Sequence, residues 1–373
     1  MRILHINHRD IRHPKAGGLE TLVHEFGRRW VAQGHEIRIL SSGFQGCAKE
    51  ETIDGIQIRR IGREEYFNFI AGLWGKHHNW LDADLVIEHL SKVACFIPLF
   101  LRDRAYLSEV PHIFGKAIFK EVPWLLGQYV YWMERALPLA YKNHPAWVIS
   151  PSTANELKNM GFTNVKVLYA GVDERLFDLK PQPASQPTVI YVGRIRKYKG
   201  IVDPLLKAWP IVIQKIPSAR LILVGKGDYE NQVREAIHSS DLEKSVTMAG
   251  FLDEPQKMDL LRTAWLLVYP STKEGWGLPV IEAGAIGIPT VASNSPGLRD
   301  SVQHEKTGLL TPHGNVEFLA SSILQMLENP SLRQSLGAAA RQYSQQFHWD
   351  TVAKKALDFI LDQTAKSTRS EAQ

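Results

Sequence analysis

Short apolar segments alternate with helical patterns along most of this chain, and this alternation limits the folds that it can adopt. The segment 2–7 (RILHIN) suits a buried strand, a helical pattern covers 19–34, and a second strand is expected at 35–40. The helical spacing places three large apolar residues on one face: Leu22, Phe26 and Trp30. Strand, helix and strand in this order make a βαβ unit, so the sequence predicts a parallel sheet with helices on both faces.

The same alternation continues in two blocks of similar size. Further strands are expected at 82–89, 146–152, 165–171, 188–195, 219–225, 246–251, 265–271 and 289–293. The segment 178–187 (DLKPQPASQP) is rich in proline and is expected to be a linker. We therefore predict one Rossmann-like domain over 1–177 and a second over 188–348. The remainder, 349–373, is expected to be a helix that crosses back to the first domain and ends in a polar tail.

Charge, cysteine content and hydropathy exclude several classes of protein. The 373-residue chain has a net charge of +5 that is spread over both halves, which argues against a dedicated nucleic-acid surface. Its two cysteines, Cys47 and Cys95, are too few and too distant for a zinc ribbon or a disulfide framework. No signal peptide is recognised, and no apolar run reaches the roughly 18 residues of a membrane span. We therefore expect a cytoplasmic protein.

The stretch 270–293 (PSTKEGWGLPVIEAGAIGIPTVAS) places two glutamates around a glycine turn at the expected end of a strand. Glu274 is thereby directed to the edge of the sheet where ligands bind in open α/β folds. We expect Pro279 at the first helical position and Glu282 in the first turn, near the partly positive helix N-terminus. The two carboxylates can accept hydrogen bonds from a ribose and from a second polyol. A helix-capping glutamate beside an exposed one is the structural alternative.

Two other strand ends carry residues that suit an anionic ligand. In 191–201 (YVGRIRKYKGI), Arg194 and Lys199 lie just beyond a strand, and Lys199 opens a helical pattern. A helix N-terminus beside Arg and Lys is an anion site, although a solvated basic loop has the same composition. Gly225 follows the next strand and resembles part of a dinucleotide fingerprint, or an ordinary turn. Gly18 at the start of the first helix could bring backbone N–H groups close to a phosphate, or mark a loop tip.

Taken together, these segments resemble a family-four retaining glycosyltransferase of the GT-B fold. The signature of that family is Glu, seven residues and Glu, which here is Glu274-GWGLPVI-Glu282. Other matching segments are GGLETL (17–22), SPSTANEL (150–157), AGVDERLF (170–177), YVGRIRKYKG (191–200), LVGKGD (223–228), AGFL (249–252) and SPGLRDSVQHEKTGLL (295–310). The resemblance implies an α/β fold of two Rossmann-like, doubly wound parallel-sheet domains facing a central cleft, with the acceptor on the side of the N-terminal domain.

The resemblance also implies roles for individual residues. Arg194 and Lys199 would bind the donor diphosphate, which the backbone around Gly18 would touch from the other domain. Glu282 would hold the nucleotide ribose, and Glu274 would contact the donor sugar near the reaction centre. The residues implied beside them are Gly225 and Leu278 in the nucleotide pocket and Gly275, Trp276 and Gly277 at the donor sugar.

The family also implies a catalytic-site histidine from the N-terminal domain. His112, in VPHIFGKAIF, is the best candidate because it follows a short apolar segment and precedes a glycine, although it could be a core histidine. Glu88 and His89 end another strand and are weaker candidates. The chain departs from the family pattern at Trp276, where phenylalanine is usual, and at Asp300, where glutamate is usual.

The implied reaction needs no metal and no cofactor, since the nucleotide-diphospho-sugar is a co-substrate. Cleavage of its anomeric C–O bond places negative charge on the β-phosphate, which nearby cations would stabilise. The string Asp82-Ala-Asp84 matches a metal-binding pattern of another glycosyltransferase class, but it opens a strand and so points away from the ligand edge. No side chain suggests itself as a covalent nucleophile, so we expect a front-face displacement in which the leaving phosphate helps to deprotonate the acceptor.

The acceptor is suggested only by the aromatic segment 120–141 (KEVPWLLGQYVYWMERALPLAY). Four cations flank its apolar residues: Lys116, Lys120, Arg135 and Lys142. This composition suits an interfacial patch near a membrane that holds a lipid-linked acceptor, in cell-surface polysaccharide or glycolipid synthesis. The alternative, which we favour, is a buried helix of ordinary length bounded by Pro123 and Pro138 and packed on the sheet.

Other functions of two Rossmann-like domains remain as alternatives. A UDP-sugar epimerase would need its own acid and base residues, and a phosphorylase would need a lysine for pyridoxal phosphate; neither set is recognised in the sequence. A catalytically inactive sugar-nucleotide-binding protein disagrees with the intact Arg194, Lys199, Glu274 and Glu282. A nicotinamide dehydrogenase lacks support because no complete G-x-G-x-x-G follows a strand.

Overall fold

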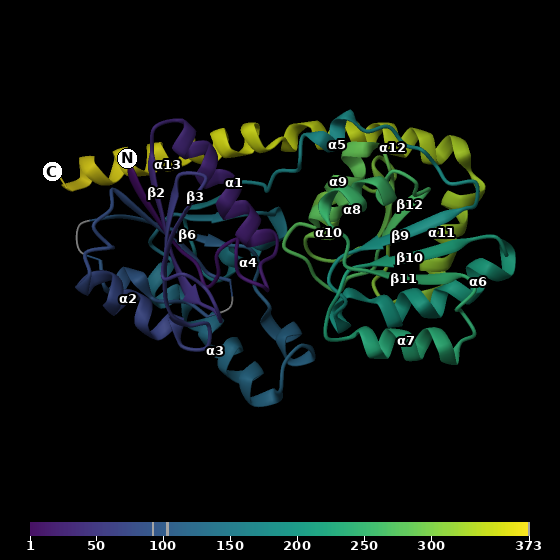
Figure 1. Cartoon of the computed structure of the whole chain (residues 1–373), viewed down its shortest axis with the longest axis horizontal. Coiled ribbons are helices and arrows are strands. Elements are labelled where there is room, and N and C mark those ends of the chain that lie inside the picture. The colour runs from purple at the N-terminus through teal and green to yellow at the C-terminus, as the bar shows by residue number, and fades with distance from the viewer. Residues whose placement is uncertain (92, 102–103, 372–373) are drawn as a thin grey trace. The chain divides into compact units, whose positions relative to one another are not determined.

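The computed structural model describes residues 1–91, 93–101 and 104–371 and contains two compact α/β units (Figure 1). The first unit comprises Met1–Gly171 together with Trp349–Gln373, and the second comprises Val172–His348. This division lies a few residues before the expected boundary at 177. The expected linker 178–187 runs along the second unit, where the backbone N–H groups of Gln182 and Ala184 donate to Arg262 and Thr263.

The sheet of the first unit has eight strands in the order β3-β4-β2-β1-β5-β6-β7-β8. Their bounds are β1 (Arg2–Ile6), β2 (Glu36–Gly43), β3 (Glu50–Ile53), β4 (Ile56–Arg63), β5 (Leu85–His89), β6 (Ala105–Val110), β7 (Ala146–Val148) and β8 (Val165–Val167). All neighbours are parallel except the β3–β4 hairpin. The order reverses between β1 and β5, so the loops that follow these two strands flank the switch point where open α/β sheets bind ligands.

Helices cover both faces of this sheet. They are α1 (Gly18–Ala32), α2 (Phe67–His77), α3 (Trp124–Tyr141), α4 (Pro151–Asn159) and α13 (Trp349–Glu371), with short turns η1 (Ile97–Leu99) and η2 (Gly115–Lys120). The expected apolar face of α1 is confirmed, because Leu22, Phe26 and Trp30 are all buried. A fully buried tryptophan of this kind requires a covering element, and α13 provides it.

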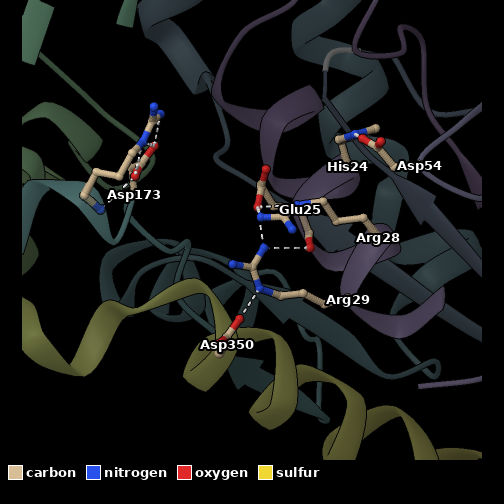
Figure 2. Close-up of polar contacts among 8 residues, drawn as sticks. His24, Glu25, Arg28, Arg29, Asp54, Asp173 and Asp350 are labelled. Carbon is tan, nitrogen blue, oxygen red and sulfur yellow. Dashed lines mark hydrogen bonds and ion pairs between the residues drawn. The ribbon is translucent and has the colours of Figure 1, made fainter. Parts of the chain in front are cut away.

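The C-terminal helix α13 packs against α1 (Figure 1), and polar contacts fix its register. The indole N–H of Trp30 donates to the backbone oxygen of Ala353 (3.0 Å). Arg29 lies between Glu25 and Asp350, and its Nε donates to Asp350 (2.6 Å; Figure 2). On the other side of α1, His24 is bonded to Asp54 in the β3–β4 turn (2.8 Å; Figure 2).

The sheet of the second unit is entirely parallel and has the order β11-β10-β9-β12-β13-β14. Its strands are β9 (Thr188–Val192), β10 (Arg220–Val224), β11 (Val246–Gly250), β12 (Leu266–Tyr269), β13 (Thr290–Ser293) and β14 (Gly308–Thr311). In chain order this is the Rossmann arrangement 3-2-1-4-5-6, which reverses between β9 and β12. The loops after these two strands therefore flank the switch point of the second unit.

The helices and turns of the second unit follow the strands in alternation. They are α5 (Arg175–Asp178), η3 (Lys197–Lys199), η4 (Ile201–Leu206), α6 (Lys207–Lys215), α7 (Glu230–Ser239), α8 (Glu254–Leu261), α9 (Leu278–Ile286), α10 (Leu298–Ser301), α11 (Val316–Glu328), α12 (Pro330–Ser344) and η5 (Gln345–Phe347). The five residues of β9 are all buried. This matches the expectation that its apolar run lies between two layers of helices.

Candidate active site

An ion pair links the two loops that flank the switch point of the second unit. Lys199, at the end of η3 after β9, donates from Nζ to Glu274 Oε1 after β12 (2.6 Å) and to the hydroxyl of Tyr269 (3.3 Å). The side chains of Lys199 and Glu274 are only 6% and 12% exposed. The structure thus brings together two residues that the sequence placed on the diphosphate and on the sugar. A buried pair of this kind presents a cation and a carboxylate to the same small volume.

Aromatic rings support the ammonium group of Lys199. Its Nζ lies 4.9 Å and 5.3 Å from the ring centres of Tyr198 and Tyr269, within the range of cation–π attraction. Tyr191 stacks on Tyr269, and burial raises the pKa of both phenols, so neither is ionised at neutral pH. The lysine is therefore held by neutral rings and one carboxylate.

Arg194 differs from Lys199 in its surroundings. Its side chain is exposed, and among the residues that the structure describes its guanidinium has no hydrogen-bond or ion-pair partner. The loop that carries it is tied down instead through its backbone, since Tyr191 donates from its hydroxyl to the carbonyl of Arg194 (3.0 Å). An anchored loop with an exposed guanidinium is well suited to an external anion.

Glu282 lies on α9, one residue further into the helix than the sequence suggested. The helix begins at Leu278 after an N-cap at Gly277, so Pro279 is the second helical residue and Glu282 falls in the second turn. Its carboxylate accepts two hydrogen bonds from Lys257 Nζ (3.1 and 3.2 Å). The expectation of a first-turn glutamate is therefore wrong. The carboxylate is held by a lysine, and not by the N–H groups at the helix N-terminus.

Sequence reasoning did not identify Lys257, which lies on α8. Its side chain is 12% exposed and also pairs with Glu254. Burial lowers the pKa of Lys257, but attraction from Glu282 and Glu254 outweighs it, so the net shift is upward and the lysine stays charged. The one feature of the local sequence that could have pointed to Lys257 is its position in the first helix after the AGFL segment.

The remaining residues expected in the donor pocket contribute backbone more than side chains. The Trp276 ring is 2% exposed and packs edge-on against Phe347 (5.3 Å), so it belongs to the core. The N–H of Gly225 donates to the carbonyl of Gly250 (2.7 Å). A Cβ at Gly225 would lie 1.9 Å from the carbonyl oxygen of Gly193, so this glycine allows the loops after β9 and β10 to meet. Gly275 and Leu278 lie in the turn and helix start beside Glu274.

In the first unit, the loop between β1 and α1 is fixed by a buried ion pair. Arg60 donates from Nε and Nη2 to the two oxygens of Asp10 (2.7 and 2.8 Å), and both side chains are at most 1% exposed. Burial alone would raise the pKa of Asp10, but the hydrogen bonds from Arg60 hold it below its usual value. The N–H of Gly17, next to Gly18, donates to Glu20 (2.7 Å), so this donor is already satisfied within the helix cap.

His112 follows β6 and is partly exposed, whereas the two weaker candidates lie in the core. The His112 ring packs edge-on against Phe114 (4.3 Å) and lines a small pocket with Leu90 and Met133. Glu88 is 1% exposed and accepts hydrogen bonds from the hydroxyls of Tyr106 (2.9 Å) and Tyr141 (3.0 Å). The backbone N–H of Cys95 also donates to Glu88 Oε1 (2.6 Å). These hydrogen bonds give Glu88 a structural role.

A buried polar row that was not predicted from the sequence crosses the first sheet. His5 Nδ1 contacts His89 Nε2 (2.9 Å), and His89 Nδ1 contacts Glu109 Oε2 (3.1 Å). All three side chains are fully buried. Burial lowers the pKa of His89 to about 3 and raises that of Glu109 to about 8, so both groups are neutral at pH 7. This removes His89 from the candidates for contact with a ligand.

Helix α3 is only half covered, which corrects the expectation of a buried helix. Its inner face is buried at Gly127, Val130, Glu134, Leu137 and Tyr141. Its outer face exposes large apolar side chains: Trp124 (66%), Leu125 (76%), Trp132 (62%) and Leu139 (88%). Pro138 lies inside the helix and does not end it. Lys116, Arg135 and Lys142 nearby are exposed, whereas the side chain of Lys120 lies outside the described residues.

Two further observations concern metals and membranes. Asp82 and Asp84 lie before β5, where both contact Arg2 (3.4 and 3.3 Å) at the end of the sheet away from the switch point. Among the described residues, no group of three or more His, Cys, Asp or Glu side chains is arranged to hold a metal ion. No helix in residues 1–91, 93–101 and 104–371 is both long and apolar enough to cross a membrane.

Comparison with protein families gives two matches that together span both units. Residues 16–176 match the model described as Glycosyltransferase Family 4, and residues 173–343 match Glycosyl transferases group 1. Among curated proteins, the chain is 26% identical to a glycogen synthase of Mycobacterium tuberculosis, over 92% of this chain and 91% of that protein. It is 29% identical to a phosphatidyl-myo-inositol mannosyltransferase of Mycobacterium leprae, over 91% and 92% of the two chains.

Solved structures of similar architecture cover nearly the whole chain. A sucrose-phosphate synthase from Thermosynechococcus elongatus aligns with a TM-score of 0.81 and 23% identity, over 98% of this chain and 99% of that one. Anabaena Alr3699/HepE, solved in complex with UDP and glucose, aligns with a TM-score of 0.75 and 19% identity, over 97% and 100% of the chains. At these identities the structural likeness concerns the fold.

Proposed function

Because the chain belongs to the family-four glycosyltransferases of the GT-B fold, we propose that it transfers a sugar with retention of anomeric configuration from a nucleotide-diphospho-sugar. The acceptor would be a glycan or a lipid-linked glycan. The observation that carries this proposal is the pairing of Lys199 with Glu274 at the switch point of the second sheet, beside the exposed guanidinium of Arg194. This set offers two cations for a diphosphate and one carboxylate for a hydroxyl.

The donor diphosphate would bind to Arg194 and Lys199. When phosphate oxygens approach, Lys199 can share its three N–H donors among Glu274, Tyr269 and the ligand. Both cations stabilise the negative charge that reaches the β-phosphate as the glycosidic bond breaks, and stabilisation of developing charge is usually the largest contribution to catalysis. We propose that these side chains do this without a bound metal and without a cofactor.

Two carboxylates would recognise hydroxyl groups of the donor. Glu282, oriented by Lys257, would accept from the ribose, and Glu274, oriented by Lys199, would accept from the sugar. In the transfer, the anomeric C–O bond to the phosphate breaks and a new bond forms to the acceptor oxygen on the same face. The proton of the acceptor hydroxyl passes to the leaving phosphate oxygen, and His112 would contact the sugar from the first unit.

The acceptor side of the proposal rests on α3. Its exposed Leu125, Trp132 and Leu139 are spaced by seven residues and so lie along one stripe, with Arg135 and Lys142 exposed nearby. An apolar stripe with flanking cations suits the surface of an anionic membrane. We therefore place the protein at the inner face of a membrane, acting on a lipid-linked acceptor. A curated relative named for phosphatidyl-myo-inositol mannosyl transfer agrees with this class of acceptor.

Calorimetric titration with UDP, GDP and ADP, with EDTA present, tests the donor site first. We expect one of the three to bind with micromolar affinity, because the proposed contacts do not involve a metal. The variant Glu274→Gln should keep this binding and lose sugar transfer, since its carboxylate is assigned to the sugar and not to the nucleotide. Absence of binding by all three nucleotides, or loss of nucleotide binding in Glu274→Gln, would contradict the assignment.

Flotation with liposomes tests the membrane contact separately. Vesicles of phosphatidylcholine with phosphatidylglycerol should carry the protein upward, and vesicles of phosphatidylcholine alone should carry less. The double variant Trp132→Ser and Leu139→Ser should stay at the bottom. Phe318→Ser, which removes an apolar side chain of similar exposure (54%) from the second unit, is the matched control and should float normally. Equal flotation of all three proteins would rule out α3 as the contact surface.

A further inference from the structure

A buried carboxylate on α3 holds the loop that begins with His112. Glu134 lies on the inner face of α3 and is 6% exposed. Its Oε1 accepts a hydrogen bond from the backbone N–H of Phe114 (2.7 Å), and its Oε2 accepts one from that of Gly115 (2.8 Å). A carboxylate is costly to bury unless hydrogen bonds compensate it, so these two contacts explain an acidic residue on this face.

The backbone of the loop is shaped to receive an anion. Phe114 has right-handed helical angles (φ −69°, ψ −42°), and Gly115 has a left-handed φ of +54°. Consecutive residues in these two conformations turn their N–H groups to one side and form an anion-binding concavity, or nest. The absence of a Cβ at Gly115 makes the second conformation inexpensive. The Glu134 carboxylate occupies this nest.

One of the two held residues, Phe114, is the residue against which His112 packs. The imidazole ring lies edge-on against the Phe114 ring, with centres 4.3 Å apart. His112 and Glu134 also line the same small pocket, together with Met133 and Leu137 of α3. The carboxylate therefore fixes the backbone N–H groups two and three positions after His112, and with them the aromatic ring against which the imidazole packs.

We propose that Glu134 is a positioning residue for His112, which it acts on through the 114–115 nest. The proposal rests on the proposed function, in which His112 contacts the donor sugar. Glu134 itself touches no substrate. Loss of its two hydrogen bonds to the loop would let the loop and the imidazole shift together. A misplacement of about 1 Å at a reacting centre can lower the rate about a hundredfold.

The variant Glu134→Gln tests the proposal because it keeps the size of the side chain. Its amide NH₂ would face one of the two backbone donors, so one hydrogen bond of the nest is lost. We would record the imidazole signals of His112 by NMR through a pH titration, assigned with His112→Asn, and measure kcat and KM for the donor. We expect changed His112 signals and titration midpoint, and a kcat lowered about tenfold or more with KM nearly unchanged.

Tyr141→Phe is the matched control. It removes another buried hydrogen bond of α3, from the Tyr141 hydroxyl to Glu88 (3.0 Å), without touching the nest. It should lower the melting temperature and leave the His112 signals in place, and Glu134→Asp should restore part of the kcat. Wild-type His112 signals in Glu134→Gln, or an equal change in Tyr141→Phe, would overturn the proposal. A failure of the proposed function would give a different result, because the wild-type chain would then bind no nucleotide. The NMR comparison would still decide whether Glu134 orients His112.

Discussion

The buried row of His5, His89 and Glu109 makes the stability of the first unit depend on pH, and Glu109→Gln should reveal it. Burial raises the pKa of Glu109 from 4.5 to about 8. Between these values the unfolded chain has released a proton that the folded chain still holds. Unfolding therefore becomes easier as pH rises, by about 1.4 kcal/mol per pH unit. Over the full interval this corresponds to about 5 kcal/mol.

The interval from pH 6.5 to 8 isolates the carboxyl group. The pKa of His89 is lowered from 6.5 to about 3, so its own contribution to stability is lost as pH falls below 6.5 and changes little above it. From pH 6.5 to 8 the wild-type chain should lose about 2 kcal/mol that Glu109→Gln retains. Other groups titrate equally in both proteins and cancel in the difference.

Hydrogen exchange of the β6 amides measures the opening free energy of this unit without interference from the second one. After correction for the pH dependence of chemical exchange, the amide exchange rates of the wild-type chain should rise relative to those of Glu109→Gln as pH rises. The rates of the two proteins should therefore converge or cross. A constant difference would show that Glu109 does not titrate in this range. A change of opposite sign would show that the folded chain holds fewer protons than the unfolded chain at this row, and would refute a raised pKa of Glu109.

Three further substitutions test other parts of the structure. Arg60→Met leaves Asp10 buried without its cation and should cost about 3–5 kcal/mol, seen as a lower melting temperature; a change below 1 kcal/mol would mean that water reaches Asp10. Ile360→Ala opens a cavity under α13 and should cost about 2–5 kcal/mol, measured by exchange of the α1 amides, with the second unit unaffected as the internal control. Gly225→Ala places a Cβ 1.9 Å from the carbonyl of Gly193 and should abolish nucleotide binding in calorimetry while the first unit keeps its exchange protection. Normal binding by this variant would show that the loops can separate at little cost.

Most of the strands were predictable because their apolar runs are local. The strand ends also placed Arg194 and Glu274 correctly, since in a parallel sheet the residues that follow neighbouring strands meet at one edge. The β3–β4 hairpin was missed although Asp54-Gly55 is a typical two-residue hairpin turn. β3 has only four residues, two of them glutamates, and Arg59 and Arg60 interrupt the apolar alternation of β4, so the hairpin gives little hydrophobic signal.

The features that escaped the sequence depend on contacts between distant residues. The sequence suggested both Lys199 and Glu274, but not that they bind each other across 75 positions. Helix α3 is apolar on two faces, and periodicity cannot tell which face the rest of the unit covers. The row of His5, His89 and Glu109 comes from three strands whose polar residues look unrelated until the strand order is known.

The packing of α13 on α1 has a consequence for synthesis on the ribosome. The second unit is one continuous segment, Val172–His348, and so can complete its sheet as soon as it emerges. The first unit begins to form earlier but finishes later, because Trp30 needs the helix that starts at Trp349. Phe26 and Trp30 therefore stay uncovered while nearly the whole chain is made. The unit whose synthesis begins earlier is therefore completed after the other one.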